Sequence, residues 1–156
     1  MVNHNLLSHY DLFPTLLDAL GLPNSEAEKL PGRSFAPILR GEPLGEREAL
    51  VVFDEYGPVR MIRTQEWKYV HRYPYGPNEL YNLNSDPGEE HNLLEAGQPI
   101  SSEITQQAAA LKGRLDEWFT HYVDPRLDGV REAVYGKGQL DLAGPGGQGR
   151  LAYQID

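Results

Sequence analysis

The sequence predicts an α+β fold in which one long helix covers a small antiparallel sheet of about four strands. Two observations carry this prediction. Residues 59–64 and 67–73 are short runs of β-branched, aromatic and long side chains separated by two residues, which is typical of a hairpin. Residues 101–122 then place one apolar stripe along a helix, and such a helix after an antiparallel sheet usually packs on one sheet face.

Two further segments complete the predicted sheet. Residues 49–53 read ALVVF, a continuously apolar run that suits a strand covered on both faces. Residues 79–83 form a short strand, and the turn residues Asp86, Pro87 and Gly88 follow it. A sheet of about four strands is a common size for such a domain.

The helix at 101–122 is predicted to form the core together with the sheet. Ser101 or Ser102 can cap its first turn. Trp118 is expected to be buried, because it belongs to the apolar stripe. The sheet residues expected in the same core are Leu50, Val52, Met61 or Ile62, and Val70.

An N-terminal helix is predicted over residues 8–20. Proline is tolerated in the first turn of a helix and not deeper, so Pro14 favours Asp11 over Ser8 as the N-cap. The leucines at helical spacing predict that one face of this helix lies in a core; they are Leu12, Leu16, Leu17 and Leu20.

The chain is predicted to divide into a folded domain, residues 1–123, and a tail, residues 124–156. Glycines recur in the tail, and neither a helical nor a strand period is visible there. Such a composition predicts a segment that is extended over the surface or poorly ordered.

Composition excludes several classes of function. The net charge is −9, and no cluster of Lys and Arg interrupts that acidity, so nucleic acid is not expected as a partner. The chain has no cysteine, which excludes a disulfide framework and a thiolate metal site. No apolar run approaches the roughly 20 residues of a membrane span, so none is predicted.

Two motifs occur in a fixed order along the chain. The first is SHYDLFPTLL at 8–17, followed by LPGRS at 30–34 and LRG at 39–41. The second joins R-x-I-R-T-x-x-W-K-Y at 60–69 to E-L-Y-N-L-x-x-D-P-x-E-x-x-N-L at 79–93. Together they resemble the C-terminal part of type I sulfatases, the arylsulfatase family of the alkaline phosphatase superfamily.

The resemblance implies the C-terminal part of an alkaline-phosphatase-like α/β sulfatase fold. It also implies an N-terminal catalytic sulfatase domain as partner, which this sequence lacks. We then expect unmatched apolar surface on the helix at 8–20 and on the strand at 49–53, and self-association of the isolated chain.

Sulfatases of this family use a formylglycine made from Cys or Ser in a C/S-x-P-x-R motif, beside a divalent cation. The resemblance therefore implies formylglycine and calcium or magnesium in the parent enzyme. The segment from Ser34 to Pro37 has the wrong Ser-to-Pro spacing and lacks the Arg. We expect no catalytic residue, metal site or cofactor in this chain, and no turnover by the chain alone.

The cations of the hairpin are the remaining candidates for a site. In an intact enzyme, Arg63, His71 and Arg72 are candidates to contact a sulfate or its leaving group, and Lys137 in the tail is a candidate to reach an anion. The alternative is a solvated strand face whose cations pair with neighbouring Glu and Asp, and exposed strand charges favour it.

Two classes of function follow from the sequence. In the first, the chain supports the fold, and at most the substrate cleft, of a sulfuric ester hydrolase. In the second, it is a stand-alone, non-catalytic binding or assembly module of the same fold. A phosphodiester or phosphonate hydrolase of the superfamily is a further alternative, because this region does not distinguish sulfur from phosphorus.

Overall fold

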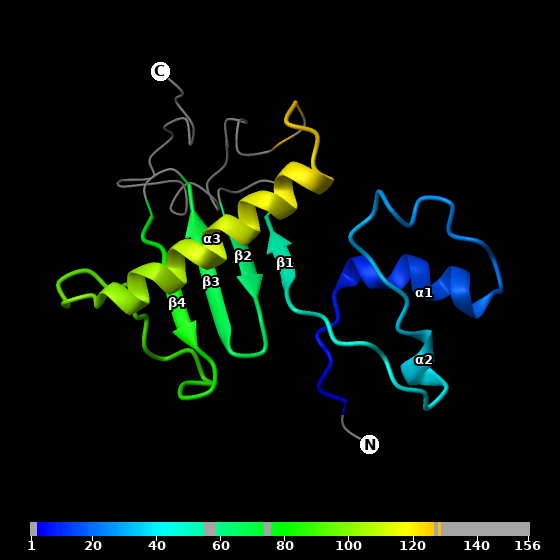
Figure 1. Ribbon diagram of the computed structural model, residues 1–156, viewed down its shortest axis with the longest axis horizontal. Helices are drawn as coiled ribbons and strands as arrows, with labels where there is room; N and C mark the ends of the chain where they lie inside the picture. Colours follow the sequence, from blue (N-terminus) through cyan, green and yellow to red (C-terminus); the bar gives the residue numbers. More distant parts are fainter. Residues whose placement is uncertain (1–2, 55–58, 74–75, 127, 129–156) are drawn as a thin grey trace, which may run out of the picture. The chain divides into compact units, whose positions relative to one another are not determined.

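The computed structural model describes residues 3–54, 59–73, 76–126 and 128 (Figure 1). The chain divides into two compact units, residues 1–50 and 51–156. Each unit is described by itself. Among the described residues, no helix combines the length and apolar composition that crossing a membrane requires.

The second unit is built on a four-stranded sheet. The strands are β1 (Leu50–Phe53), β2 (Val59–Arg63), β3 (Trp67–Arg72) and β4 (Glu79–Asn82), and their spatial order follows the sequence. β2 pairs antiparallel with β3, and β3 pairs antiparallel with β4. The antiparallel sheet of about four strands is thereby confirmed.

The β2–β3 hairpin turns at the two residues that the sequence indicates. Thr64 closes this turn with both backbone and side chain: its N–H donates to the Trp67 carbonyl (2.8 Å), and its Oγ1 accepts from the Trp67 N–H (2.9 Å). A threonine hydroxyl that accepts a nearby N–H stabilises a turn locally. This explains a tight connection without the Asn-Gly or Asp-Gly that short hairpins prefer.

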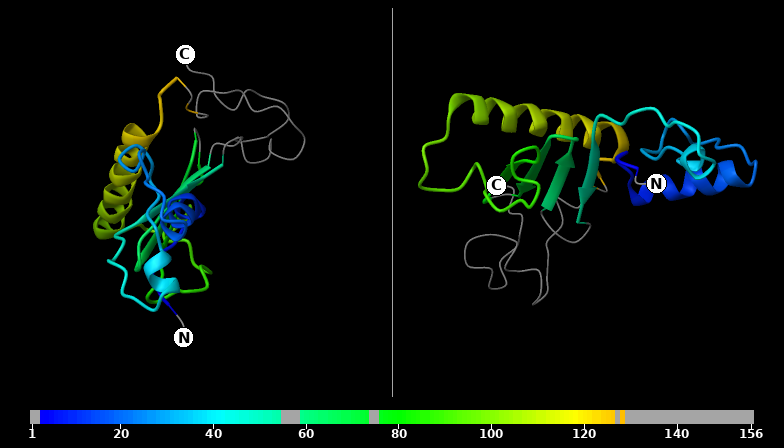
Figure 2. Two further views of the ribbon diagram at one scale, coloured as in Figure 1. Left: turned by 90° about the vertical axis from the view of Figure 1, so that its right-hand side faces the viewer. Right: turned by 90° about the horizontal axis from the view of Figure 1, so that it is seen from below.

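Helix α3 (Ser102–Tyr122) lies along one face of the sheet (Figures 1 and 2). Ser101 caps it, since its Oγ accepts the N–H of Ile104 (3.2 Å). The helix buries a stripe of three residues at i, i+4 and i+8 spacing: Leu111, Leu115 and Phe119. The predicted helix and its cap are confirmed, but Trp118 is only half-buried and Phe119 takes its place in the core.

The sheet face beneath α3 is set by the strand register. Ile62 lies opposite Tyr69, and Tyr69 lies opposite Leu80, so these three buried side chains share one face. Met61 and Val70 pair on the other face. Of the alternatives Met61 and Ile62, Ile62 is therefore the residue under the helix. Val70 was also expected there, but it is buried on the opposite face of the sheet.

The side chains of strand β1 that face α3 are not the ones that the sequence analysis expected. The ring of Phe53 contacts the rings of Phe119 and Trp118, with centroids 5.2 and 6.0 Å away. Val51 shares that face and is 2% exposed, whereas Val52 points the other way and is 47% exposed. Leu50 is buried as expected, but strand alternation places it on the face of Val52 rather than under the helix. The expectation that Val52 lies in the core was wrong.

The first unit contains a 3-10 turn η1 (His9–Asp11), helix α1 (Leu12–Ala19) and the short helix α2 (Ala36–Leu39). The N-terminal helix is thereby confirmed. Its buried side is the polar one: Thr15 Oγ1 donates to the Asp11 carbonyl (2.7 Å) and accepts the N–H of Phe35 (3.0 Å). These bonds hold the segment before α2 against α1.

The leucine face of α1 is exposed. Leu12, Leu16 and Leu20 are more than half exposed, and Leu17 is half-buried. The expectation that this face lies in a core is wrong for this chain, because Asp11 and Thr15 turn the opposite side of the helix toward residues 33–35.

Gly32 shows why the loop before α2 needs a glycine. A Cβ at this position would lie 2.0 Å from the carbonyl oxygen of Tyr10, which no side chain can do without a backbone shift. The LPGRS motif therefore has a packing role, since it lets the loop pass closely beneath the start of the first helix.

Candidate functional site

The sequence-predicted substrate residues do not converge on one point. Arg63 lies opposite Lys68 in the strand register and shares a sheet face with Met61, on the side away from α3. Arg72 lies on that same face, whereas His71 lies opposite Arg60 on the face that α3 covers. Lys137 lies outside the described residues.

Arg72 is engaged within the sheet. Its Nη2 and Nε donate to Glu79 Oε1 at 2.5 and 3.1 Å, and Tyr81 Oη donates to Glu79 Oε2 at 3.1 Å. Lys68 pairs with Glu89 on the same face. The alternative of strand-face cations paired with acidic residues thus describes Arg72 and Lys68.

Arg63 differs from its neighbours. Its side chain is exposed at the end of β2, and within the described part of the chain it has neither a hydrogen bond nor an ion pair. An exposed guanidinium keeps all five N–H donors for an anionic ligand.

His71 is held between two tyrosines on the helix face. Its Nδ1 lies 2.9 Å from Tyr69 Oη, and its ring meets the Tyr73 ring edge-on at 4.1 Å. Burial, reinforced by the positive charge of Lys112, lowers the pKa of His71 to about 4. Burial likewise raises the pKa of Tyr69 to about 12. Both groups are neutral at neutral pH, so His71 supplies no positive charge to an anion there.

Arg60 is a hairpin cation that the sequence analysis did not choose as a site residue and did not expect to be buried. It is 7% exposed, its guanidinium lies over the Phe119 ring at 3.5 Å, and it pairs with Asp128. A desolvated cation over an aromatic ring adds stability beyond area burial. Strand alternation was the available signal, because it places Arg60 on the face of Ile62.

A second buried charge cluster lies in the first unit. Arg47 holds the fully buried carboxylate of Asp11 with two parallel bonds, Nη2 to Oδ1 at 2.5 Å and Nη1 to Oδ2 at 2.7 Å. Burial by itself would raise the pKa of Asp11, but the bonds from Arg47 and from the backbone N–H groups of Arg33 and Ser8 hold that pKa below its usual value. Asp11 is therefore ionised and structural.

The second motif is structural as well. Asp86 accepts the N–H groups of Glu90 (3.0 Å) and His91 (2.9 Å). Asn92 Oδ1 accepts the N–H of Leu80 (3.0 Å), and its Nδ2 donates to the Asn78 carbonyl (3.2 Å). The interpretation of Asp86 as a turn carboxylate is confirmed, and Asn92 covers the outer edge of β4.

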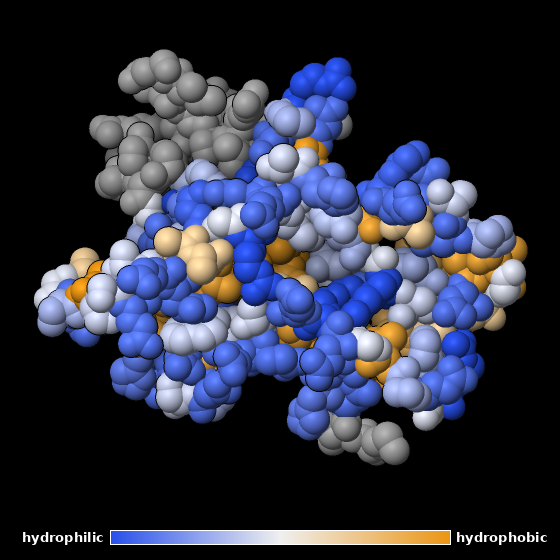
Figure 3. All heavy atoms as spheres, in the orientation of Figure 1, coloured by the Kyte–Doolittle hydropathy of each residue, from blue (hydrophilic) through white to orange (hydrophobic). Residues whose placement is uncertain are grey.

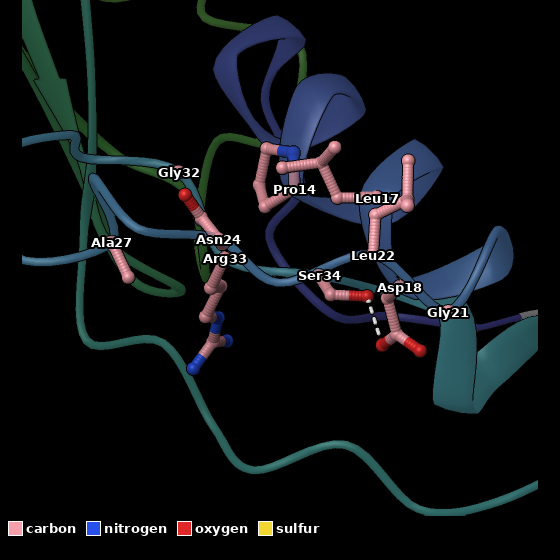
Figure 4. Close-up of a pocket in the computed structure, with 10 residues that line it drawn as sticks. All are labelled: Pro14, Leu17, Asp18, Gly21, Leu22, Asn24, Ala27, Gly32, Arg33 and Ser34. Carbon is pink, nitrogen blue, oxygen red and sulfur yellow. Dashed lines mark hydrogen bonds between the residues drawn. The ribbon is translucent and has the colours of Figure 1, made fainter.

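A hollow of about 570 Å³ opens beside α1 (Figure 4). Its polar edge contains Ser34, whose hydroxyl donates to Asp18 Oδ2 at 2.6 Å. Arg40 also bonds Asp18, at 3.3 Å. The Ser34 hydroxyl is committed to a carboxylate and to the Ala36 N–H, which it accepts at 3.1 Å, so it is a loop-closing group rather than an activated nucleophile.

An exposed apolar surface covers one side of α1. We call Leu12, Phe13, Leu16 and Leu20 the α1 apolar face; each is more than half exposed. Hydrophobic residues also reach the surface in the region of α1 in Figure 3. Four large apolar side chains on one helix are more than the scattered exposure expected on a monomer, and they indicate an interaction surface. The predicted unmatched apolar surface on this helix is thus present.

The described residues contain no group of three or more His, Cys, Asp or Glu side chains that could hold a metal ion. The arrangement in hand is therefore one of structural charge clusters, one unengaged arginine and an exposed apolar helix face.

The family of the chain follows from comparison with known proteins. The family described as "N-sulphoglucosamine sulphohydrolase, C-terminal" matches residues 1–119. The chain belongs to this family. The resemblance to the C-terminal part of sulfatases is thereby confirmed.

Individual sulfatases match as well. The Delta 4,5-hexuronate-2-O-sulfatase of Bacteroides thetaiotaomicron is 40% identical over 121 residues, which covers 73% of this chain and 24% of the relative. The solved structure of a 2-O GAG sulfatase superposes with a TM-score of 0.55 at 34% identity, covering 75% of this chain and 27% of that one. A phosphonate monoester hydrolase of Agrobacterium radiobacter has a TM-score of 0.50 at 28% identity, with 76% and 25% covered.

This sulfatase C-terminal domain spans about a quarter of the length of the relatives it matches. Its fold is that of the C-terminal part of alkaline-phosphatase-like sulfatases, as predicted.

Proposed function

We propose that the chain acts as the C-terminal part of a sulfuric ester hydrolase and completes the fold of a catalytic domain supplied by the rest of the protein. The observation that carries this proposal is the α1 apolar face in a chain that corresponds to a quarter of its relatives. In this proposal residues 1–123 form the docking domain, and residues 124–156 are a tail appended to it.

The energetics of the α1 apolar face support docking. Complete burial of a Leu or Phe side chain contributes about 1.5–3 kcal/mol. Three of these side chains are just over half exposed and Leu20 is 71% exposed, so covering them would add on the order of 1 kcal/mol each. This gain favours covering the α1 apolar face over leaving it exposed to water, and it is most effective when the covering segment belongs to the same polypeptide, which loses less translational and rotational freedom on docking.

The cofactors of the proposed enzyme would be held outside this chain. Formylglycine requires a Cys or Ser in the modification motif, and the chain has no cysteine. A hard cation requires several converging oxygen ligands, and the described residues offer no such group. Formylglycine and calcium or magnesium would therefore find neither the modification motif in this sequence nor a ligand set among its described residues.

The contribution of this chain to substrate binding is proposed for one sheet face. Arg63 has a guanidinium without a described partner, so it is the strongest of the four proposed contacts. Arg72 could contact a substrate only while keeping its bonds to Glu79. His71 is neutral and enclosed by tyrosines, and Lys137 completes the proposed set from the tail.

A phosphonate or phosphodiester ester is the second candidate substrate class. The structural likeness to the phosphonate monoester hydrolase of Agrobacterium radiobacter favours it. Nothing in the described residues of this chain selects sulfur over phosphorus.

Co-production with an upstream segment of the source gene tests the proposal. We expect a segment that carries C/S-x-P-x-R to co-purify with this chain and to hydrolyse an aryl sulfate faster than an aryl phosphonate monoester. Leu16→Glu on the α1 apolar face should abolish the complex, whereas the matched control Ile100→Glu, also on an exposed apolar residue, should not. Faster phosphonate turnover would select the second candidate, and a monodisperse chain that binds no such segment would favour the stand-alone module.

A further inference from the structure

Arg60 is a buried arginine of the β2–β3 hairpin with aromatic neighbours. It is 7% exposed, and its guanidinium lies 3.5 Å from the centroid of the Phe119 ring and 5.1 Å from that of the Tyr73 ring. Aromatic rings attract a guanidinium, but they supply neither a full negative charge nor strong hydrogen-bond acceptors for its five N–H donors. A buried cation of this kind needs an anion beside it.

The carboxylate that serves Arg60 comes from a distant part of the chain. The cations on the other face of the sheet find their carboxylates within residues 79–89. Arg60 instead pairs with Asp128, which is 68 positions away and lies beyond the end of α3 at Tyr122. Within the described part of the chain, the counterion of Arg60 is thus supplied by the tail.

The chain turns directly after α3, and this turn precedes Asp128. Asp124 Oδ1 accepts the N–H of Arg126 at 2.9 Å, and its Oδ2 accepts from the Arg126 side chain at 2.6 Å. An Asp side chain that bonds the backbone two residues on closes a turn. The side chain of Asp128 is 20% exposed, so the slot that it occupies beside Arg60 is open to water on one side.

We propose that Arg60 is a carboxylate-binding site and that residues 123–128 are a strap, which occupies this site through Asp128 and fastens the C-terminal tail to the hairpin. Arg60 is the second residue of β2 and lies opposite His71 near the end of β3. The strap therefore meets the hairpin at the end away from the β2–β3 turn. The remainder of the tail starts from that fixed point, whereas Arg63 lies at the turn.

Thermal unfolding of the whole 156-residue chain tests the pairing. Tryptophan fluorescence follows the second unit, because both tryptophans, Trp67 and Trp118, belong to it. Asp128→Ala should lower the Tm by several degrees, because it leaves Arg60 buried without a counterion. Glu117→Ala, which removes an exposed carboxylate from α3, is the matched control and should change the Tm little.

The double variant isolates the interaction from other effects of the substitution. In the Arg60→Met background, Asp128→Ala should no longer lower the Tm, because no buried cation is left to be unpaired. An unchanged Tm in Asp128→Ala alone, or an equal fall with and without Arg60, would overturn the inference.

Sodium formate tests the ligand chemistry, because formate carries the group that Asp128→Ala removes. At matched ionic strength, formate should raise the Tm of Asp128→Ala more than sodium chloride does. This excess should be absent from the wild-type chain, whose site is occupied, and from the chain that carries both Asp128→Ala and Arg60→Met. Equal effects of formate and chloride on Asp128→Ala would overturn the carboxylate-binding site.

Limited trypsin digestion, well below the Tm, tests the strap. The Arg126 side chain is 87% exposed, but cleavage after it requires the flanking residues to detach from the protein. Arg60→Met releases Asp128 without altering the cleavage site, so it should raise the initial rate of this cut by about tenfold or more, since a charged hydrogen bond no longer opposes opening. The control Arg63→Met, on an exposed arginine of the same strand, should leave the rate unchanged. An unchanged rate in Arg60→Met would overturn the strap.

Discussion

Phe119→Ala is expected to be among the most destabilising single changes in the second unit. Phe119 is buried, its ring meets Phe53 at 5.2 Å, and the Arg60 guanidinium lies 3.5 Å from its centroid. Truncating a buried Phe to Ala costs about 3–5 kcal/mol through lost burial and the cavity left behind. The loss of a desolvated cation–π contact adds about 1–2 kcal/mol, so the upper end of that range is expected.

Trp118→Ala provides the matched control for this prediction. Trp118 is the larger ring, but it is half-buried and lies one position away from the buried stripe. Truncating Trp118 loses about half of the free energy that complete burial of its side chain would contribute, which predicts a cost of about 1–2 kcal/mol. Phe119→Leu, which keeps most of the volume and loses the ring face, should cost about 1–2 kcal/mol.

Urea unfolding followed by far-ultraviolet circular dichroism measures these costs, since it does not depend on tryptophan fluorescence. The free energy of unfolding is read from the midpoint at constant slope. If Trp118→Ala destabilised the chain as much as Phe119→Ala, the assignment of the core stripe to Leu111, Leu115 and Phe119 would be refuted.

Four further outcomes are expected. The pKa of His71 is about 4 in the folded chain and 6.5 ordinarily, so between these pH values His71 is protonated in the unfolded chain and neutral in the folded one. The free energy of unfolding is therefore unaffected by His71 above pH 6.5 and decreases as the pH falls toward 4. Partial exposure reduces the amount to about 1–2 kcal/mol, and His71→Gln should remove this slope from pH-dependent urea titrations. Asp11→Asn should cost about 3–5 kcal/mol, because it leaves Arg47 buried without a counterion, and a loss below 1 kcal/mol in the same assay would contradict the buried pair. Sedimentation of the isolated chain should show self-association that Leu16→Glu removes; a wild-type monomer at all concentrations would contradict an interaction role for the α1 apolar face. The chain alone should hydrolyse no aryl sulfate with or without calcium or magnesium, and calorimetry should detect no micromolar binding of either ion.

Local patterns in the sequence were sufficient for the architecture of the sheet and its helix. The alternation in β2 and β3 predicts which residues share a face, and the register confirms that Arg63 and Met61 lie together. The cap at Ser101 and the apolar stripe predict α3 within one residue at its start. These features depend on neighbours close in the chain, so the sequence contains them directly.

The sequence did not predict correctly which side of β1 and which side of α1 faces inward. The run ALVVF has no alternation, so only pairing with β2 and packing under α3 decided that Val51 rather than Val52 lies inward. The leucines of α1 look like a core stripe, yet Thr15 faces inward because it bonds residue 35, twenty positions away.

The sequence by itself determined the family, the strands, the long helix and the absence of cysteine; the tertiary structure decided which charges are buried. The Asp11–Arg47 pair spans 36 positions, and the pairing of Arg60 with Asp128 spans 68. No periodicity connects residues so far apart, because contacts of this kind arise only when the chain has closed those loops.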